Sequence, residues 1–146
     1  MYEIMPARWQ DLKELRHLEQ ICFDRDAWPW IELLAVLIFP GTVCVKAVVS
    51  GKMVGFVAGD VRKWQRVGWI ATIGVLPVYR RMGIAKALLA ACEEQMRMPT
   101  VRLCVRQSNL SAQFLYRREG YHQIEIWKDY YSGKENAIVF EKKGLT

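Results

Sequence analysis

One segment of the chain, residues 73–89, limits the possible folds most strongly. It reads IGVLPVYRRMGIAKALL and joins the end of a β-rich run, 68–76, to an amphipathic helical pattern over 81–98. A further short β-rich run follows at 101–105. A strand–helix–strand unit implies a crossover between strands of one sheet. The segment therefore predicts an α/β or mixed α+β class with a mixed sheet and helices on both of its faces.

The rest of the chain fits that class without a repeat, linker or domain boundary, so we expect one domain over residues 1–146. Residues 42–49 and 53–61 predict a hairpin around Ser50-Gly51-Lys52. The resulting order of elements is βααβββαβαββ. The other predicted elements are an extended start at 2–7, helices at 9–23, 29–39 and 109–119, and strands at 124–127 and 137–141.

Composition narrows the class of protein further. The chain has 146 residues, of which 52% are hydrophobic and 25% charged, as expected for one soluble globular domain. No apolar run approaches the ~20 residues that a membrane-spanning helix needs. The first residues lack the basic-then-apolar layout of a signal peptide. We therefore expect a cytoplasmic protein without membrane contact.

The cysteines and the net charge also carry information. Cys22, Cys44, Cys92 and Cys104 lie far apart in apolar segments and have no metal-ligand spacing with either histidine. We expect reduced thiols, no disulfide and no metal. The net charge of +6 favours an anionic partner such as a polyphosphate cofactor or nucleic acid. Nucleic acid is the weaker candidate, because no helix carries a dense basic stripe.

The turn inside residues 73–89 has the features of a phosphate site. The first turn of a helix has free backbone N–H groups and the positive end of the helix dipole, so it binds anions. Gly83 leaves room for close approach, Ala85 keeps the next position small, and Arg80 and Arg81 add positive charge. The turn is neither a Walker loop, since the G-K-[ST] ending is missing, nor a dinucleotide G-x-G-x-x-G fingerprint. A surface helix cap with incidental arginines is the alternative.

These residues resemble a known family. Arg80, Gly83 and Ala85 match the pattern [RQ]-x-x-G-x-[GA] of the coenzyme A pyrophosphate loop in the GNAT superfamily of N-acetyltransferases. The segments LCVRQSNLSAQFLYRREGY, 103–121, and KDYYSGKENAIVFEK, 128–142, resemble the N-terminal amine acetyltransferases of that superfamily, including bacterial enzymes that acetylate a ribosomal protein's N-terminal alanine. The resemblance implies acetyl-coenzyme A as co-substrate and a mostly antiparallel sheet of about seven strands.

The resemblance also implies roles for single residues. Backbone groups of Ile73, Gly74 and Val75 would pair with the pantetheine arm where two strands splay apart. Asn109 would hydrogen-bond the cofactor arm, and Tyr116 would protonate the departing thiolate, a role that suits a phenol. The loop that would hold the pyrophosphate consists of Arg80, Arg81, Met82, Gly83, Ile84, Ala85 and Lys86. The aromatic residues expected to line the acceptor site are Trp28, Trp69, Tyr130 and Tyr131.

The family pattern fails at one position. The resembled enzymes place a glutamate general base where this chain has Cys104. Cys104 is either an acetyl-carrying nucleophile, which needs an activating base, or a small core residue, with deprotonation left to water or another group. We prefer the second interpretation. Glu119, Asp60 and Asp129 remain as unplaced carboxylates.

The absence of a glutamate base at position 104 affects which amines can serve as the acetyl acceptor. An α-amine with a pKa of about 7.7–8.0 is neutral in roughly a tenth or more of molecules at pH 7, whereas a lysine amine is almost entirely charged. The sequence therefore predicts an N-acetyltransferase acting on a primary amine, most plausibly a protein or peptide N-terminus. A small-molecule amine acceptor and a catalytically weak coenzyme A-binding module remain as alternatives.

Overall fold

The computed structural model describes residues 1–145, without the side chain of Arg25. The order of its strands and helices confirms the order predicted from the sequence. The helices are α1 (Leu12–Phe23), α2 (Trp30–Ile38), α3 (Ile84–Met96) and α4 (Leu110–Arg118). The strands are β1 (Glu3–Pro6), β2 (Thr42–Val49), β3 (Lys52–Arg62), β4 (Val67–Val75), β5 (Thr100–Arg106), β6 (His122–Tyr131) and β7 (Glu135–Lys143).

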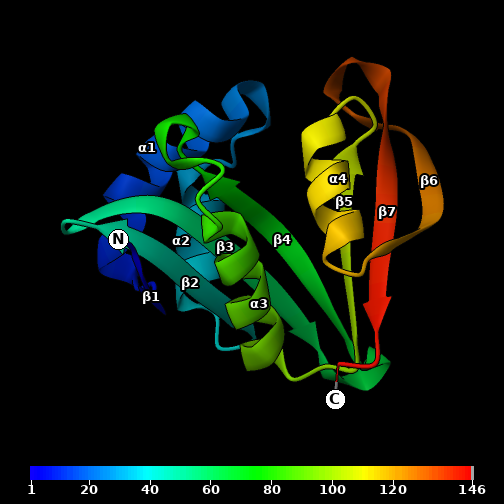
Figure 1. Cartoon of the computed structure of the whole chain (residues 1–146), viewed down its shortest axis with the longest axis horizontal. Helices are drawn as coiled ribbons and strands as arrows, with labels where there is room; N and C mark the ends of the chain where they lie inside the picture. Colours follow the sequence, from blue (N-terminus) through cyan, green and yellow to red (C-terminus); the bar gives the residue numbers. More distant parts are fainter. Residues whose placement is uncertain (146) are drawn as a thin grey trace.

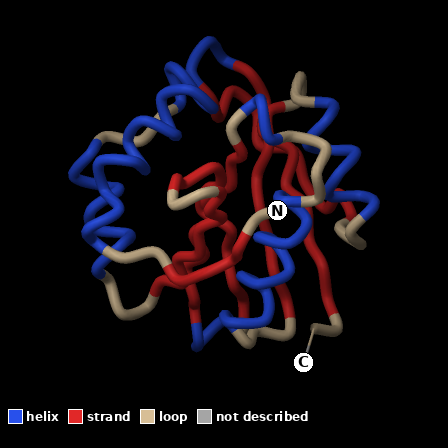
Figure 2. Tube along the Cα trace, turned by 60° about the vertical axis from the view of Figure 1, so that its left-hand side comes forward, coloured by secondary structure: helices blue, strands red, loops and turns tan. Residues whose placement is uncertain are grey.

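The strands form one sheet in the order β1-β2-β3-β4-β5-β7-β6. Only the β4–β5 pair is parallel, and α3 makes the crossover between these two strands. Helices α3 and α4 cover one face of the sheet, and α1 and α2 cover the other (Figures 1 and 2). The mixed, mostly antiparallel seven-stranded sheet expected from the resemblance is confirmed.

The parallel pair opens soon after it begins. β4 pairs with β5 only through residues 67–69, opposite 100–102. On the other edge of β4, Thr72 and Ile70 face consecutive residues of β3, so Ala71 is the extra residue of a β-bulge. A bulge bends its strand and increases the local twist. Residues 70–75 have no β5 partner, and the sheet divides into two halves that diverge in Figure 1.

A separate apolar core lies on each face of the sheet. The first lies between the sheet and α3 and α4, and includes Leu88, Leu103 and Phe140, all nearly inaccessible to solvent. The second lies between the sheet and α1 and α2, around Leu18 and Phe56. The two cores fix α3 and α4 on one face of the sheet and α1 and α2 on the other.

Two boundaries differ from the sequence prediction for physical reasons. Helix α3 begins at Ile84 rather than Arg81, because Arg81 and Gly83 adopt left-handed backbone angles, with φ of 64° and 81°. Strand β6 is ten residues long rather than four. It is an edge strand with mostly exposed side chains, so its sequence lacks the apolar alternation that would reveal a buried strand. No helix in residues 1–145 is long and apolar enough to span a bilayer.

Candidate active site

The turn after β4 has the geometry of an anion site. Gly83 is the N-cap of α3, and its left-handed φ of 81° suits glycine. Within residues 1–145, no backbone N–H from Arg81 to Lys86 donates to another backbone group. These donors lie at the positive end of the α3 dipole, where an anion is stabilised. The structure therefore brings the predicted pyrophosphate loop together as one cluster of free donors.

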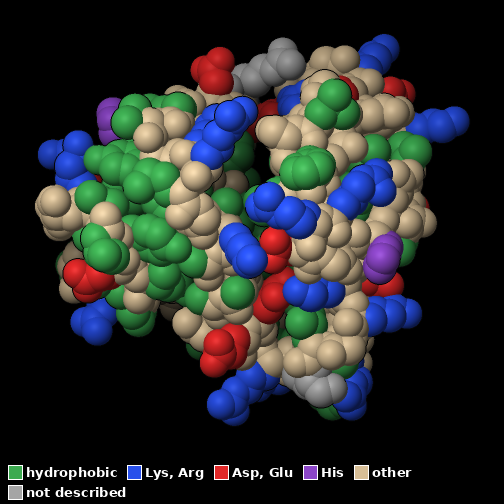
Figure 3. Space-filling model, in the orientation of Figure 1, with side chains coloured by type: hydrophobic (Ala, Val, Ile, Leu, Met, Phe, Trp, Pro, Cys, Tyr) green, Lys and Arg blue, Asp and Glu red, His purple; other side chains and the backbone are tan. Residues whose placement is uncertain are grey.

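Basic side chains accompany this turn. Arg81 and Lys86 are exposed, and Figure 3 shows Lys and Arg side chains along the hollow between the two halves of the molecule. Arg80 also has a structural role, because its Nε donates a hydrogen bond to the carbonyl oxygen of Val75 at 2.9 Å. That hydrogen bond holds the turn against the end of β4, a role that the sequence did not reveal.

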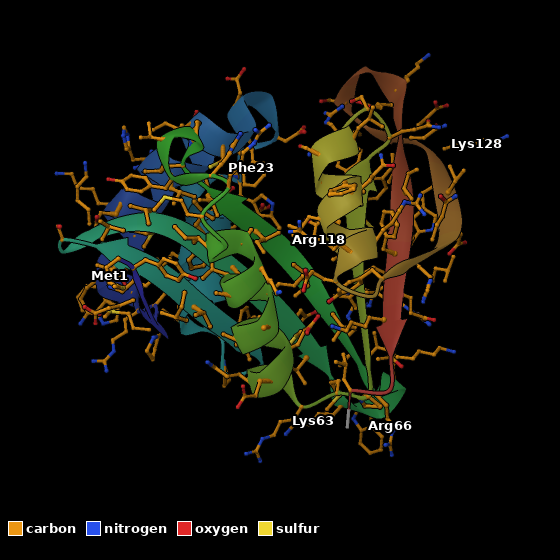
Figure 4. All side chains as sticks on the ribbon, viewed as in Figure 1. Met1, Phe23, Lys63, Arg66, Arg118 and Lys128 are labelled. Atoms are coloured by element: carbon orange, nitrogen blue, oxygen red, sulfur yellow. The ribbon has the colours of Figure 1, made fainter. Side chains whose placement is uncertain are left out.

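The backbone stretch predicted to pair with the pantetheine arm lies where β4 has no β5 partner. It consists of Ile73, Gly74 and Val75. The carbonyl oxygen of Val75 accepts a hydrogen bond from the Cys22 thiol at 3.5 Å, in addition to the one from Arg80. This carbonyl is therefore already hydrogen-bonded within the chain. At Gly74 an added Cβ would stand 3.2 Å from the ring of Phe23. Glycine therefore lets the end of α1 lie directly on the strand. Phe23 and Arg118 of α4 mark the two sides of the gap in Figure 4.

Tyr116 projects from α4 toward the first core. Its ring lies 6.0 Å from that of Tyr121 and 6.1 Å from that of Phe140. The hydroxyl makes no hydrogen bond within residues 1–145, although every fully buried side-chain nitrogen or oxygen there has a partner. The hydroxyl therefore reaches accessible space. Burial raises the pKa of Tyr116, so the phenol is protonated at neutral pH, as a proton donor must be.

Asn109 caps helix α4. Its Oδ1 accepts a hydrogen bond from the backbone N–H of Ala112 at 3.2 Å and one from the Ser111 hydroxyl at 3.3 Å. Its amide nitrogen donates to nothing in the described part of the chain and stays available to a ligand. The predicted cofactor contact therefore shares a side chain with a structural cap.

This double role gives a testable prediction for Asn109. Asn109→Asp keeps the capping oxygen and removes the amide donor, so the fold should keep its thermal midpoint while the KM for acetyl-coenzyme A rises about tenfold. Asn109→Ala removes both groups and should also lose about 1 kcal/mol of stability. Thermal melts and steady-state kinetics check both variants. An unchanged KM in Asn109→Asp would mean that Asn109 only caps the helix and does not contact the cofactor.

The acceptor-side pocket lies on the α1–α2 face of the sheet. Its volume is about 470 Å³, and its walls come from α2, from the segment just before α2 and from the sheet strands β2 to β6. The structure brings all four predicted acceptor residues to this one pocket, namely Trp28, Trp69, Tyr130 and Tyr131. No group of His, Cys, Asp and Glu side chains suited to a metal ion occurs among the described residues.

Trp127 belongs to the same pocket and was missed from the sequence. Its ring stacks on Trp69 at 5.9 Å and lies 5.3 Å from Tyr130, whose ring lies 5.0 Å from that of Tyr131. The four rings form a continuous aromatic wall. Trp127 lies inside the strand predicted at 124–127, but its place on this wall depends on the register of β6, β7 and β5, in which Trp127 and Arg106 both pair with Ala137.

Cys104 lines the pocket rather than the core. Burial and then the negative charge of Glu125 raise the pKa of its thiol to about 11. The thiol is therefore protonated at neutral pH, which suits neither a general base nor a nucleophilic thiolate. Of the unplaced carboxylates, Asp60 also lines the pocket and is paired with Arg62 at 3.1 Å.

The other two carboxylates lie elsewhere. Glu119 is the C-cap residue of α4 and lies 3.5 Å from the Arg118 guanidinium. Asp129 is an exposed residue of β6 with a left-handed backbone. Neither residue lines the acceptor-side pocket.

An ion-pair cluster joins distant segments beside the pocket. Arg106 Nη2 lies 2.7 Å from Asp26 Oδ1, and its Nη1 lies 2.7 Å from Glu135 Oε1. The guanidinium also lies over the ring of Tyr131, 4.7 Å from its centroid. Hydrogen bonds from Ser108 and from Arg106 lower the pKa of Glu135 to about 2. The cluster holds the α1–α2 connection against the β6–β7 turn.

The fold and these two sites define a class of protein. A turn with free N–H donors and a protonated phenol lie on the α3–α4 side of the sheet. An aromatic pocket lies on the opposite face, at the same two strands. The molecule is a mixed α/β protein with a candidate anion site and a candidate aromatic site on opposite faces of one sheet.

The comparisons with known proteins define the family. The model of the acetyltransferase (GNAT) family matches residues 6–121, and the chain belongs to this family of acyltransferases. An N-alpha-acetyltransferase of Sulfurisphaera tokodaii is 27% identical over 94% of this chain and 90% of its own length. The [ribosomal protein bS18]-alanine N-acetyltransferase of Haemophilus influenzae is 40% identical over 46% of this chain, a match that spans half of that enzyme.

A solved structure agrees with these relatives. The ribosomal-protein-S18-alanine N-acetyltransferase of Escherichia coli superposes with a TM-score of 0.89 at 25% identity, covering 99% of this chain and 94% of that one.

Proposed function

We propose that this protein transfers the acetyl group of acetyl-coenzyme A to the α-amine of a protein or peptide N-terminus. The observation that carries the proposal is the course of β4, which lines the aromatic pocket with residues 69–71, has no β5 partner over residues 70–75 and leads into the turn with free N–H groups before α3. The relatives from S. tokodaii and H. influenzae, named for N-alpha-acetylation and for alanine N-acetylation of a ribosomal protein, support a polypeptide N-terminus as acceptor.

Each half of the site has its own task in the transfer. The α3 turn binds the pyrophosphate of the cofactor, and the unpaired edge of β4 guides the thioester into the gap. The amine enters from the aromatic pocket and attacks the thioester carbonyl directly. Tyr116 gives its proton to the sulfur as the C–S bond breaks, so coenzyme A leaves as a thiol. No covalent acetyl-enzyme is required, in keeping with the raised pKa of the Cys104 thiol.

The test is a panel of acceptors supplied to the purified full-length chain with acetyl-coenzyme A. Peptides with a free N-terminus should release coenzyme A thiol at rates well above background. The same peptides with a blocked N-terminus and an internal lysine should not. Turnover with small free amines alone would indicate a small-molecule enzyme. Binding of acetyl-coenzyme A in calorimetry without turnover on any amine would indicate a binding module.

A further inference from the structure

Glu19 of α1 is a buried carboxylate that the transfer described above does not use. Only 1% of its surface is accessible. Among the described residues, the two other buried glutamates have basic partners, since Glu93 pairs with Lys142 and Glu141 with Arg102. Glu19 has no basic partner among the side chains that the structure describes. A buried charge without a counter-ion destabilises a fold, so its presence needs a reason.

The two carboxylate oxygens of Glu19 accept hydrogen bonds from two different parts of the site. Oε2 accepts a hydrogen bond from the Thr72 hydroxyl at 2.8 Å, and Oε1 accepts one from the backbone N–H of Trp28 at 3.3 Å. Trp28 lines the acceptor pocket. Thr72 follows the Ala71 bulge, in the part of β4 that lies beyond the pairing with β5. Glu19 therefore links Trp28, in the wall of the acceptor-side pocket, to Thr72, on the unpaired part of β4.

A carboxylate accepts two hydrogen bonds at once, whereas an amide of the same shape offers one acceptor and one donor. Glutamine at this position could still accept from the Trp28 N–H and could donate to the Thr72 oxygen, because a hydroxyl both donates and accepts. Glu19→Gln would therefore keep both contacts and remove only the group that can take a proton.

The transfer also lacks a proton acceptor. A neutral amine that attacks a carbonyl becomes positively charged and must lose a proton. The Cys104 thiol is itself protonated at neutral pH, and the Asp60 carboxylate is paired with Arg62. Thr72 points its hydroxyl to the α1 side of the sheet, the side from which the amine arrives, and its oxygen keeps lone pairs while it donates to Glu19.

We propose that Glu19 is a positioning residue that acts through Thr72, which passes the proton of the attacking amine to the buried carboxylate. This inference rests on the proposed acetyl transfer. As the N–C bond forms, the amine proton moves to Thr72 Oγ1 and the hydroxyl proton moves to Glu19 Oε2. The C–S bond breaks and the thiolate takes the proton of Tyr116. Solvent then returns a proton to Tyr116 and removes one from Glu19, so the two residues are restored.

The surroundings of Glu19 suit a proton acceptor. Burial raises its pKa, and the hydrogen bonds from Thr72 and Trp28 oppose that shift only in part. The titratable groups around this core include Cys22, which interacts with Arg80 and with Glu19 itself, and Cys44, which donates to the Val36 carbonyl. Asp26, in the connection that follows α1, is bound to Arg106. The helix and strand packed beside α1 contribute apolar side chains, including Leu33 and Phe56. A carboxylate in this setting has a stronger affinity for a proton than an exposed one.

The test compares steady-state kinetics of four single variants with an N-terminal peptide and acetyl-coenzyme A. Glu19→Gln and Thr72→Val should each lower kcat by about tenfold to a hundredfold, at or below the usual range for acid–base catalysis, because part of an α-amine is already neutral. Thr72→Ser keeps the hydroxyl and should stay near wild type. Glu14→Gln is the matched control, since Glu14 lies on the same helix and accepts a hydrogen bond from the Met53 N–H at 3.0 Å. It should also stay near wild type.

The pH profile separates proton transfer from a purely structural role. Wild-type kcat should fall at acid pH as Glu19 becomes protonated, and this limb should vanish or move in Glu19→Gln and Thr72→Val. The double variant should be no slower than the slower single one, because both remove the same relay.

Two outcomes would overturn the inference while leaving the proposed function intact: an unchanged kcat in Glu19→Gln, or a lower kcat with an unchanged acid limb. If Glu19→Gln fails to fold, the kcat and the acid limb of Thr72→Val test the inference in the same way. If wild type acetylates no amine, the proposed function itself fails.

Discussion

Gly83→Asp should weaken acetyl-coenzyme A binding about a hundredfold without unfolding the protein. An added Cβ meets only the Tyr2 hydroxyl, at 3.8 Å, and aspartate is among the residues that tolerate a left-handed backbone. Its carboxylate would sit at the N-terminus of α3, where it caps the free N–H groups and repels the incoming pyrophosphate. One lost charge-assisted hydrogen bond contributes about 1.5–3 kcal/mol, which corresponds to a loss of this size.

Calorimetry with acetyl-coenzyme A measures this loss, and Gly83→Asn is the matched control. Asparagine has the same shape and the same tolerance of positive φ but no charge. It should therefore bind the cofactor more tightly than the aspartate variant, with a similar thermal midpoint. Equal losses in the two variants would assign the effect to the backbone. Full affinity in a folded Gly83→Asp would place the phosphate site elsewhere.

Local patterns accounted for much of this molecule. Every helix and strand was predicted in the right order, because each has its own periodicity or its own breaker, as at Pro77 and Gly83. The turn with free N–H groups was predictable too, since a glycine between a strand and a helix has a direct physical meaning. The long edge strand β6 was not, because exposure on both faces removes the apolar alternation that marks a strand.

Contacts between distant residues account for most of what the sequence did not show. Arg106 and Asp26 are separated by 80 positions, and Thr72 and Glu19 by 53. Neither pair belongs to a local motif, so neither partner could be assigned before the fold brought them together. The same holds for the stacking of Trp69 on Trp127. The sequence indicated which residue types carry the chemistry, and the topology determines which of them meet.

Tyr116→Phe should lower kcat by about a hundredfold and leave the affinity for acetyl-coenzyme A unchanged. The substitution removes a hydroxyl that makes no hydrogen bond with the described residues and keeps a ring that packs against Tyr121 and Phe140. Stability should therefore change little. General acid catalysis contributes typically 10²–10⁴-fold, and a thiol is a good leaving group, so the lower end applies. The loss appears in kcat because charge develops on sulfur only in the transition state.

The control for Tyr116→Phe is Cys104→Ser, measured under the same conditions. The raised pKa of Cys104 means that a protonated thiol is exchanged for a hydroxyl of similar size, so activity should stay within about threefold. The raised pKa of Tyr116 adds a second signature: the wild-type enzyme should show no alkaline loss from this phenol below about pH 10, the usual pKa of tyrosine. Near wild-type kcat in Tyr116→Phe beside an inactive Cys104→Ser would contradict this mechanism, because it would move the chemistry from the phenol to the thiol.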